Sequence, residues 1–222
     1  MEREVTASPL PGPRLAEIYH EGLRLFMGQG TLNQTLSRLA ADLDQHGIEY
    51  MIIGAVALIA HGYRRFTEDI DLVITPEDLE TFHRELIGRG YVPQFPGARK
   101  RIRTAEGVRI KIITAGEFPG DGKPKPVSFP RPSEASVQIG GIRIVTLEKL
   151  IELKLASGMT APDRLRDLAE VQELIKIRGL DAEFAQKLDP YVRAKYLELW
   201  EAVRQAELMR DQQPEAGSRT DE

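Results

Sequence analysis

The chain has 222 residues, of which 41% are hydrophobic and 29% charged, enough for one large domain or one domain with a helical appendage. Its formal net charge of −4 gives no overall basic signal for nucleic acid, and the lack of cysteine excludes disulfides, thiolate zinc sites and cysteine nucleophiles. No apolar run approaches the length of a membrane span and the N-terminus does not resemble a signal peptide, so we expect a cytoplasmic protein without a membrane partner.

Helices are expected first along the chain, after a polar tail. Residues 1–13 end in three prolines, and we expect them to form a flexible tail. Apolar residues at helical spacing predict helices over residues 14–28 and 31–46, and Gly47 ends the second.

The pattern then changes to short strands separated by short helices. Residues 48–53 form an apolar run that ends at Gly54, which is typical of a buried strand. Residues 55–61 predict a short buried helix, and residues 70–74 predict the next strand. A capped helix and three more strands follow: Thr75-Pro76-Glu77-Asp78 to about Ile87, then Tyr91-Val92, 99–104 and 107–113.

The second half of the chain begins with a long loop and ends in helices. Residues 114–136 hold five prolines and three glycines, which is typical of a long loop with a function. Gly140-Gly141 predicts the turn of a hairpin. Helical spacing accounts for the rest, over residues 146–157, 162–177, 181–188 and 190–211, before a polar tail over 212–222.

Together these elements predict an α+β fold, in which a mixed β-sheet with flanking helices is followed by a helical C-terminal part. We expect a sheet-bearing domain over residues 14–145 and a helical subdomain over 146–211. Flexible tails are expected to flank them, at residues 1–13 and 212–222.

Asp69 and Asp71 point most directly to a function. Side chains alternate between the two faces of a strand, so these carboxylates share one face while Ile70 and Leu72 share the other. Neighbouring carboxylates repel one another unless a cation lies between them. Because carboxylate oxygens suit Mg²⁺ or Mn²⁺, the pair predicts a metal site.

Gly54 and the helix predicted after it favour a phosphate beside this metal. A glycine lets the backbone approach a phosphate closely, and the start of a helix offers free N–H groups and a partial positive charge to an anion. Mg²⁺ held by the aspartate pair would neutralise the charge of a triphosphate. The order of strand, glycine, helix and Asp-x-Asp strand therefore predicts a combined phosphate and metal site.

These residues, in this order, resemble the motifs of the DNA polymerase β-like nucleotidyltransferase superfamily. The likeness is carried by Gly54-Ala55, by Arg65-x-Thr67-x-Asp69-Ile70-Asp71, and by the later Lys154 and Arg166-Asp167. Within the superfamily the chain looks like the minimal nucleotidyltransferases of the abortive-infection toxin type. In those proteins a compact catalytic sheet precedes helices that carry a lysine and an Arg/Lys-Asp pair.

The resemblance implies transfer of a nucleoside monophosphate from an NTP to an acceptor, which could be RNA, a protein or a small molecule. It also implies that the protein could be the toxin of a toxin–antitoxin pair, with a cognate antitoxin protein as its partner. Asp69 and Asp71 would bind the metal, and Lys154 would contact the nucleotide or donate a proton to pyrophosphate. The other implied nucleotide-binding residues are Gly54, Ala55, Arg65, Thr67 and Asp167, the last of which would orient a basic partner.

Two positions depart from the pattern of the superfamily. Ala55 stands where a second glycine or a serine is usual, so a hydroxyl contact to phosphate is missing. Lys111, which shares a strand face with Arg109, aligns with the usual third carboxylate. A cation there repels Mg²⁺, but it could pair with Asp69 or Asp71, or bind a phosphate as a point charge. We therefore expect one metal ion rather than two.

Lys111 also leaves a second function open, in which the protein keeps the fold and binds a nucleotide or a protein partner without catalysis. A substitute carboxylate could come from Glu106, Glu117 or Asp121, and the spacing selects none of them. Transfer and binding alone are both compatible with the sequence.

Several residues have a structural explanation beside the functional one. Lys154 lies among apolar residues and could extend its ammonium group from a helix flank into solvent. Asp167 could pair with Arg164 or Arg166 on the surface of its own helix. His61 is expected to pack near the end of its helix rather than to bind a metal.

Two further segments have alternative roles. The basic run Arg99-Lys100-Arg101-Ile102-Arg103 could be a solvated strand face or a surface for an acceptor nucleic acid. The loop around Asp121-Gly122-Lys123 could cover the site as a lid or be a surface excursion.

Overall fold

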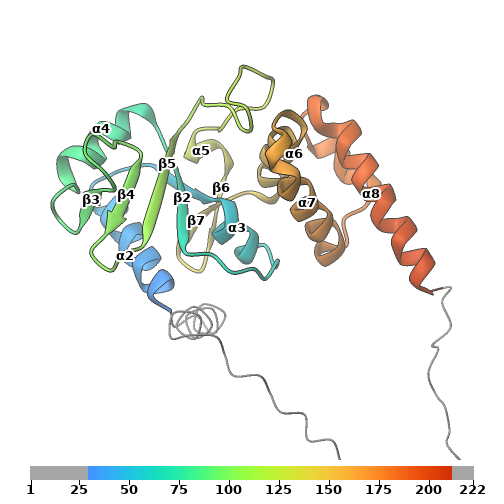
Figure 1. Ribbon diagram of the computed structural model, residues 1–222, viewed down its shortest axis with the longest axis horizontal. Coiled ribbons are helices and arrows are strands. Elements are labelled where there is room, and N and C mark those ends of the chain that lie inside the picture. Colours follow the sequence, from blue (N-terminus) through green and yellow to red (C-terminus); the bar gives the residue numbers. More distant parts are fainter. Residues whose placement is uncertain (1–29, 212–222) are drawn as a thin grey trace, which may run out of the picture.

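The computed structural model describes residues 30–211, and Figure 1 shows them as a β-sheet flanked by helices, with further helices at the C-terminal end. The predicted α+β fold, a mixed sheet with flanking helices followed by a helical C-terminal part, is confirmed. The helix predicted over residues 14–28 and the tails predicted at 1–13 and 212–222 lie outside the described residues.

Seven strands form one mixed sheet. They are β1 (Tyr50–Ile53), β2 (Asp69–Ile74), β3 (Tyr91–Pro93), β4 (Arg101–Thr104), β5 (Arg109–Thr114), β6 (Ser136–Ile139) and β7 (Ile142–Val145). Their order across the sheet is β3-β4-β5-β2-β1-β7-β6. β2 is parallel to β5 and β1 is parallel to β7, whereas the other neighbours are antiparallel.

The helices follow the predicted order, but residues 162–164 and 182–187 adopt 3₁₀ geometry, and a short helix at residues 132–135 lies within the predicted loop. The sheet is flanked by α2 (Thr31–Gln45), α3 (Gly54–Ala60), α4 (Pro76–Glu85) and α5 (Pro132–Ala135). The C-terminal part consists of α6 (Leu147–Thr160), η1 (Pro162–Arg164), α7 (Leu165–Arg178), η2 (Ala182–Lys187) and α8 (Pro190–Asp211). Residues 182–187 form a 3₁₀ helix because the stretch is short and Pro190 disfavours helical geometry at the residue before it.

Local signals in the sequence determine where these helices begin. Thr75 caps α4 by accepting a hydrogen bond from the N–H of Asp78 at 3.0 Å, and Pro76 occupies the first helical position. Thr146 caps α6 in the same way, through the N–H of Lys149. None of the helices between residues 30 and 211 has both the length and the apolar character that crossing a bilayer requires.

The sheet has one apolar and one charged face around β2, β4 and β5. On the apolar face, Tyr91 donates a hydrogen bond to Asp42 of α2 at 2.6 Å and packs edge-on against Phe82 of α4. A single buried core continues from the sheet into α6, α7 and α8, which holds the helical part in place. The strand register brings together on the opposite face Asp69, Asp71, Arg101, Arg103, Arg109 and Lys111.

Candidate functional site

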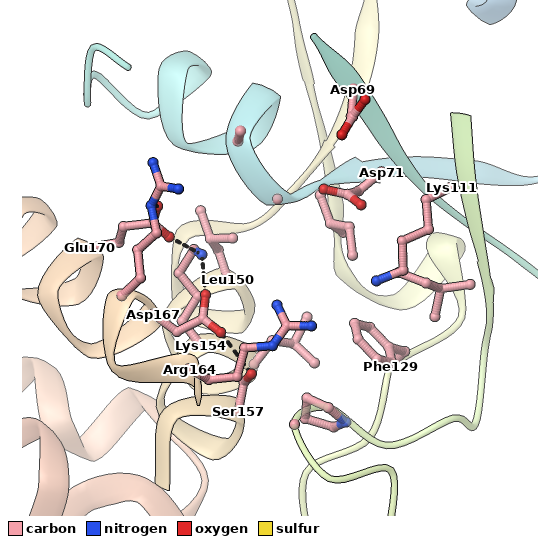
Figure 2. Close-up of a pocket in the computed structure, with 18 of the residues that line it drawn as sticks. Asp69, Asp71, Lys111, Phe129, Leu150, Lys154, Ser157, Arg164, Asp167 and Glu170 are labelled. Atoms are coloured by element: carbon pink, nitrogen blue, oxygen red, sulfur yellow. Dashed lines mark hydrogen bonds and ion pairs between the residues drawn. The ribbon is translucent and has the colours of Figure 1, made fainter. Parts of the chain in front are cut away.

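A cavity of about 590 Å³ lies against the charged face of the sheet (Figure 2). Its walls come from β2 and β5, from the loop after β5, and from the helical part between α6 and α7. All nine site residues proposed from the sequence line this cavity, namely Gly54, Ala55, Arg65, Thr67, Asp69, Asp71, Lys111, Lys154 and Asp167.

The two aspartates lie on the same face of β2, as strand alternation predicts, but their surroundings differ. Burial raises the pKa of the Asp71 carboxyl above its ordinary value, although the positive charge of Lys111 opposes this shift. Asp69 is about half exposed, and its Oδ1 accepts a hydrogen bond of 2.5 Å from Nε of Arg109. Asp71 is therefore an incompletely neutralised carboxylate in the cavity wall, whereas Asp69 already has a cationic partner.

Gly54 allows Asp71 to occupy this position. Its φ of 64° lies in the left-handed region, and a Cβ at this residue would overlap with the Asp71 carboxylate and come within 2.9 Å of its Cγ. The glycine thus provides space for a carboxylate at the point where β1 passes into α3. Nearby, Thr67 shapes the turn before β2, because its Oγ1 accepts a hydrogen bond from the N–H of Asp69 at 3.3 Å.

Lys111 lies beside Asp71 on the neighbouring strand β5, at the same level of the parallel ladder. Figure 2 shows its side chain extending from β5 into the cavity. Its charge acts on Asp71, but no ion pair within 4.0 Å joins it to either aspartate in the described part of the chain. Lys111 is therefore a cation in the cavity wall beside Asp71.

None of the candidate substitute carboxylates completes a metal site. Glu106 pairs with Arg38, and Asp121 pairs with Lys125 at 2.5 Å, and neither lines the cavity. Glu117 does line it, but it pairs with Lys100. Among residues 30–210, no three His, Asp or Glu side chains lie close enough together to hold a metal ion.

The donor set therefore does not fit two metal ions. It fits one ion at most. Among the described residues no cation is in contact with Asp71, and Arg109 uses only one oxygen of Asp69, so the other carboxylate oxygens of this pair are available to that ion. Any further ligands would have to come from a substrate or from water.

Lys154 is a buried residue with two carboxylate partners. Its Nζ donates a hydrogen bond to Oδ1 of Asp167 at 2.9 Å and forms a second ion pair with Glu170. The other oxygen of Asp167 accepts a hydrogen bond from Oγ of Ser157 at 2.7 Å. The alternatives of a solvent-directed lysine and of an aspartate paired only on its own helix surface are therefore wrong, because α6 and α7 pack these groups against each other.

Glu170 is a site residue that the sequence interpretation missed. It pairs with Lys154, with Arg65 from the segment between α3 and β2, and with Nε of Arg166 at 3.3 Å. It is almost fully buried. An acidic residue inside a helical pattern carries no sign of such contacts, because two of its three partners come from other segments of the chain.

The remaining candidates are placed as follows. His61 is buried, and its Nε2 lies 2.8 Å from the carbonyl oxygen of Val145, so it packs at the end of α3 as expected. Arg101 and Arg103 are exposed on β4, on the charged face of the sheet. Residues 117–120 of the loop after β5 line the cavity, whereas Asp121, Gly122 and Lys123 do not. The loop packs closely on α6, since a Cβ at Gly120 would come within 2.9 Å of the Ser157 carbonyl oxygen.

No protein-family model matches the chain, and no curated protein matches it. Several solved structures do. The solution structure of the antibiotic-resistance factor ANT(2'')-Ia matches with 16% identity over 81% of this chain and 98% of its own, at a TM-score of 0.48. The crystal structure of ANT(2'')-Ia in complex with adenylyl-2''-tobramycin matches with 16% identity over 78% and 97%, at a TM-score of 0.47.

A third match is an antigenic nucleotidyltransferase-like protein from Paracoccidioides brasiliensis, with 17% identity over 80% of this chain and 89% of its own, at a TM-score of 0.46. At these levels of similarity, the activity of this chain has to be inferred from its own residues. An antibiotic-resistance factor and a nucleotidyltransferase-like protein thus stand among the structures that the chain resembles.

Proposed function

We propose that the protein transfers a nucleoside monophosphate from an NTP to an acceptor. The observation that carries the proposal is a cavity in which the Asp-x-Asp pair of β2 faces cationic side chains from β5 and the helical part. Its volume of about 590 Å³ lies in the range of small-molecule sites. Carboxylates on one wall and cations on the others suit a ligand that combines phosphates with a metal ion.

Asp69 and Asp71 would hold one Mg²⁺ or Mn²⁺ ion, in line with the donor set described above. When bound, such an ion supplies charge neutralisation for the triphosphate. The raised pKa of Asp71 supports this placement, because a buried carboxylate is stabilised by any cation that comes into contact with it. In the transfer, an acceptor oxygen forms a bond to the α-phosphorus while the bond to the pyrophosphate oxygen breaks.

Lys154 and Asp167 would act on the leaving pyrophosphate side of the ligand. Both line the cavity, and their mutual hydrogen bond of 2.9 Å gives the ammonium group a defined direction. Gly54 contributes by giving Asp71 its position, and Thr67 by shaping the turn before Asp69. Ala55 and Arg65 line the same cavity, where Arg65 is held by Glu170.

The test is labelling of an acceptor with each of the four α-labelled NTPs, with Mg²⁺ or Mn²⁺, in the presence of RNA, protein or small-molecule acceptors. The wild type is expected to transfer label, and Asp69→Asn and Asp71→Asn are expected to abolish transfer. Asp44→Asn is the matched control, since Asp44 pairs with Arg143 away from the cavity. Equal labelling by the wild type and by Asp71→Asn would contradict the proposal.

A non-catalytic nucleotide-binding protein is the second candidate function. It is favoured by Lys111 at the position of the third carboxylate and by the Arg109 guanidinium on Asp69. Binding of an NTP without labelling of any acceptor would identify this function. Calorimetry with each NTP separates the two, because it measures binding whether or not transfer follows.

The toxin–antitoxin role rests on the sequence resemblance alone. It predicts that expression of the protein arrests growth, and that the product of an adjacent gene relieves the arrest by binding the protein. Growth with Asp71→Asn in place of the wild type is the control. Growth arrest by this variant would mean that toxicity does not depend on nucleotidyl transfer.

A further inference from the structure

Lys111 and Arg164 are two cations of the cavity wall that have no anionic partner in contact. In the part of the chain that the structure describes, neither side chain makes a hydrogen bond or an ion pair. Figure 2 shows the two side chains extending into the cavity from opposite sides, Lys111 from β5 and Arg164 from η1. Both are accessible to solvent, so a ligand in the cavity can reach them.

The other cations of the cavity are already committed. Arg65, Lys154 and Arg166 all pair with Glu170, and Lys154 also pairs with Asp167. A new anion would compete with these carboxylates for the charge of the three cations, whereas Lys111 and Arg164 have no carboxylate in contact. The two free cations are therefore the groups that an incoming anion meets first.

Lys111 also stands where a second metal ion would need its carboxylate ligand. A metal ion contributes positive charge to a triphosphate, and the ammonium group of Lys111 contributes the same sign of charge from the cavity wall. Arg164 adds a planar guanidinium group, whose donors match two phosphate oxygens at once. The two side chains thus supply the positive charge that a second metal ion would otherwise bring, which the carboxylates of this cavity cannot bind.

We propose that Lys111 and Arg164 form a clamp that binds the polyphosphate of an NTP from opposite walls of the cavity, in place of a second metal ion. The proposal rests on the proposed function, since it assigns the triphosphate to the same cavity. It implies that affinity for polyphosphate is retained without divalent metal. It also implies that the clamp recognises the phosphate chain and not the base.

The test is calorimetric titration of the full-length protein with inorganic tripolyphosphate and with ATP, each in excess EDTA and in Mg²⁺. The wild type is expected to bind both ligands in EDTA. Lys111→Met and Arg164→Gln should each weaken binding of tripolyphosphate about tenfold or more, as loss of a charged hydrogen bond does. Lys111→Arg should bind within about threefold of the wild type, because it keeps the charge.

Arg103→Gln is the matched control, because Arg103 is an exposed cation on the same face of the sheet but does not line the cavity. It should leave the affinity unchanged. Thermal unfolding of Arg164→Gln should match the wild type, since Arg164 has no ion pair to lose, and so should that of Lys111→Arg, which keeps the positive charge beside Asp71. Losses no larger than that of Arg103→Gln would overturn the proposal.

The two proposals fail in different ways. Binding of ATP in Mg²⁺ but of neither ligand in EDTA overturns the clamp and leaves nucleotidyl transfer standing. Binding of neither ligand under either condition overturns both. Binding in EDTA that Lys111→Met and Arg164→Gln abolish supports the clamp, whatever the acceptor is.

Discussion

At the scale of the residue, the most demanding position is Gly54. Two constraints coincide there, a φ of 64° and a carboxylate in the space that a side chain would fill. Gly47 has nearly the same φ, 65°, but nothing lies within 4 Å of the position of its Cβ. A comparison of alanine substitutions at the two glycines therefore separates the cost of the left-handed backbone conformation from the cost of displacing the Asp71 carboxylate.

Gly47→Ala should lower the free energy of unfolding by about 1–2 kcal/mol, the cost of a left-handed conformation for a residue with a side chain. Gly54→Ala should cost more, because its methyl group also displaces Asp71, and it should abolish acceptor labelling. Chemical denaturation and the labelling assay measure the two effects. A Gly54→Ala variant that is as stable and active as Gly47→Ala would contradict this account of the site.

Asp71 is expected to lower the stability of the folded protein although it is needed for activity. Its pKa is raised by burial, so its ionised form costs free energy in the folded protein at any pH above its folded pKa. This cost disappears as the pH falls through that value, because the carboxyl group is then protonated. Asp71→Asn should therefore unfold at a higher temperature than the wild type at pH 8 without divalent metal, although it is inactive.

The stability difference between Asp71→Asn and the wild type should shrink on acidification. Thermal unfolding at a series of pH values between 8 and 4 measures it. Asp44→Asn, which removes an exposed carboxylate paired with Arg143 at 3.1 Å, should show no such gain. A wild type more stable than Asp71→Asn at pH 8 would show that the protein itself neutralises Asp71.

At the scale of the element, Glu170 joins α7 to two other segments. It takes Lys154 from α6 and Arg65 from the connection between α3 and β2. Glu173 lies one turn further along α7, where it is partly exposed and pairs only with Lys176 of the same helix, at 2.8 Å. One helix thus carries a buried and an exposed ion pair.

Glu170→Ala should lower the free energy of unfolding by about 3–5 kcal/mol, since it removes the carboxylate partner of the mostly buried Arg65 and leaves Lys154 with Asp167 alone. Glu173→Ala should cost at most about 1 kcal/mol, as exposed ion pairs do. Urea denaturation measures both. Similar losses for the two variants would mean that the buried network contributes no more than a surface pair.

At the scale of the whole molecule, the cavity is built from segments that are distant in the sequence. It is lined by strands of the sheet, by the start of α3 and the connection before β2, by the loop after β5 and by the helices of the C-terminal part. A ligand bound there contacts both the sheet and the helical part, so it should stabilise the folded chain as a unit.

ATP at about 100 times its dissociation constant should raise the free energy of unfolding by about 2.7 kcal/mol, which corresponds to a rise in Tm of about 5–10 °C for a chain of this size. AMP at the same concentration should raise Tm less, because it lacks the polyphosphate that the cations of the cavity bind. Differential scanning fluorimetry measures both ligands. Equal shifts with ATP and AMP would show that the base, and not the phosphate chain, provides the affinity.

Much of the fold was accessible from local patterns. Apolar runs and caps predicted α2, α4, the strands around the aspartates and the Gly-Gly hairpin, because these signals act within one segment. Strand alternation predicted that Asp69 and Asp71 share one face of β2 and that Lys111 and Arg109 share one face of β5. The parallel register of β2 and β5 then brings Asp71 and Lys111 side by side. The structure differs from the predicted helices in the 3₁₀ geometry of η1 and η2 and in the short helix α5, which lies within the predicted loop.

The site was predicted as a set of residues but not as a set of contacts. The motifs identified nine residues that line the cavity, because residue type and spacing are properties of the sequence. The hydrogen bond from Arg109 to Asp69, the burial of Glu170 and the place of Arg164 depend on how separate segments pack. The sequence by itself determined which charges this protein carries toward its cavity, and the tertiary structure decided which of them neutralise one another, because pairing depends on distances between segments that local patterns do not set.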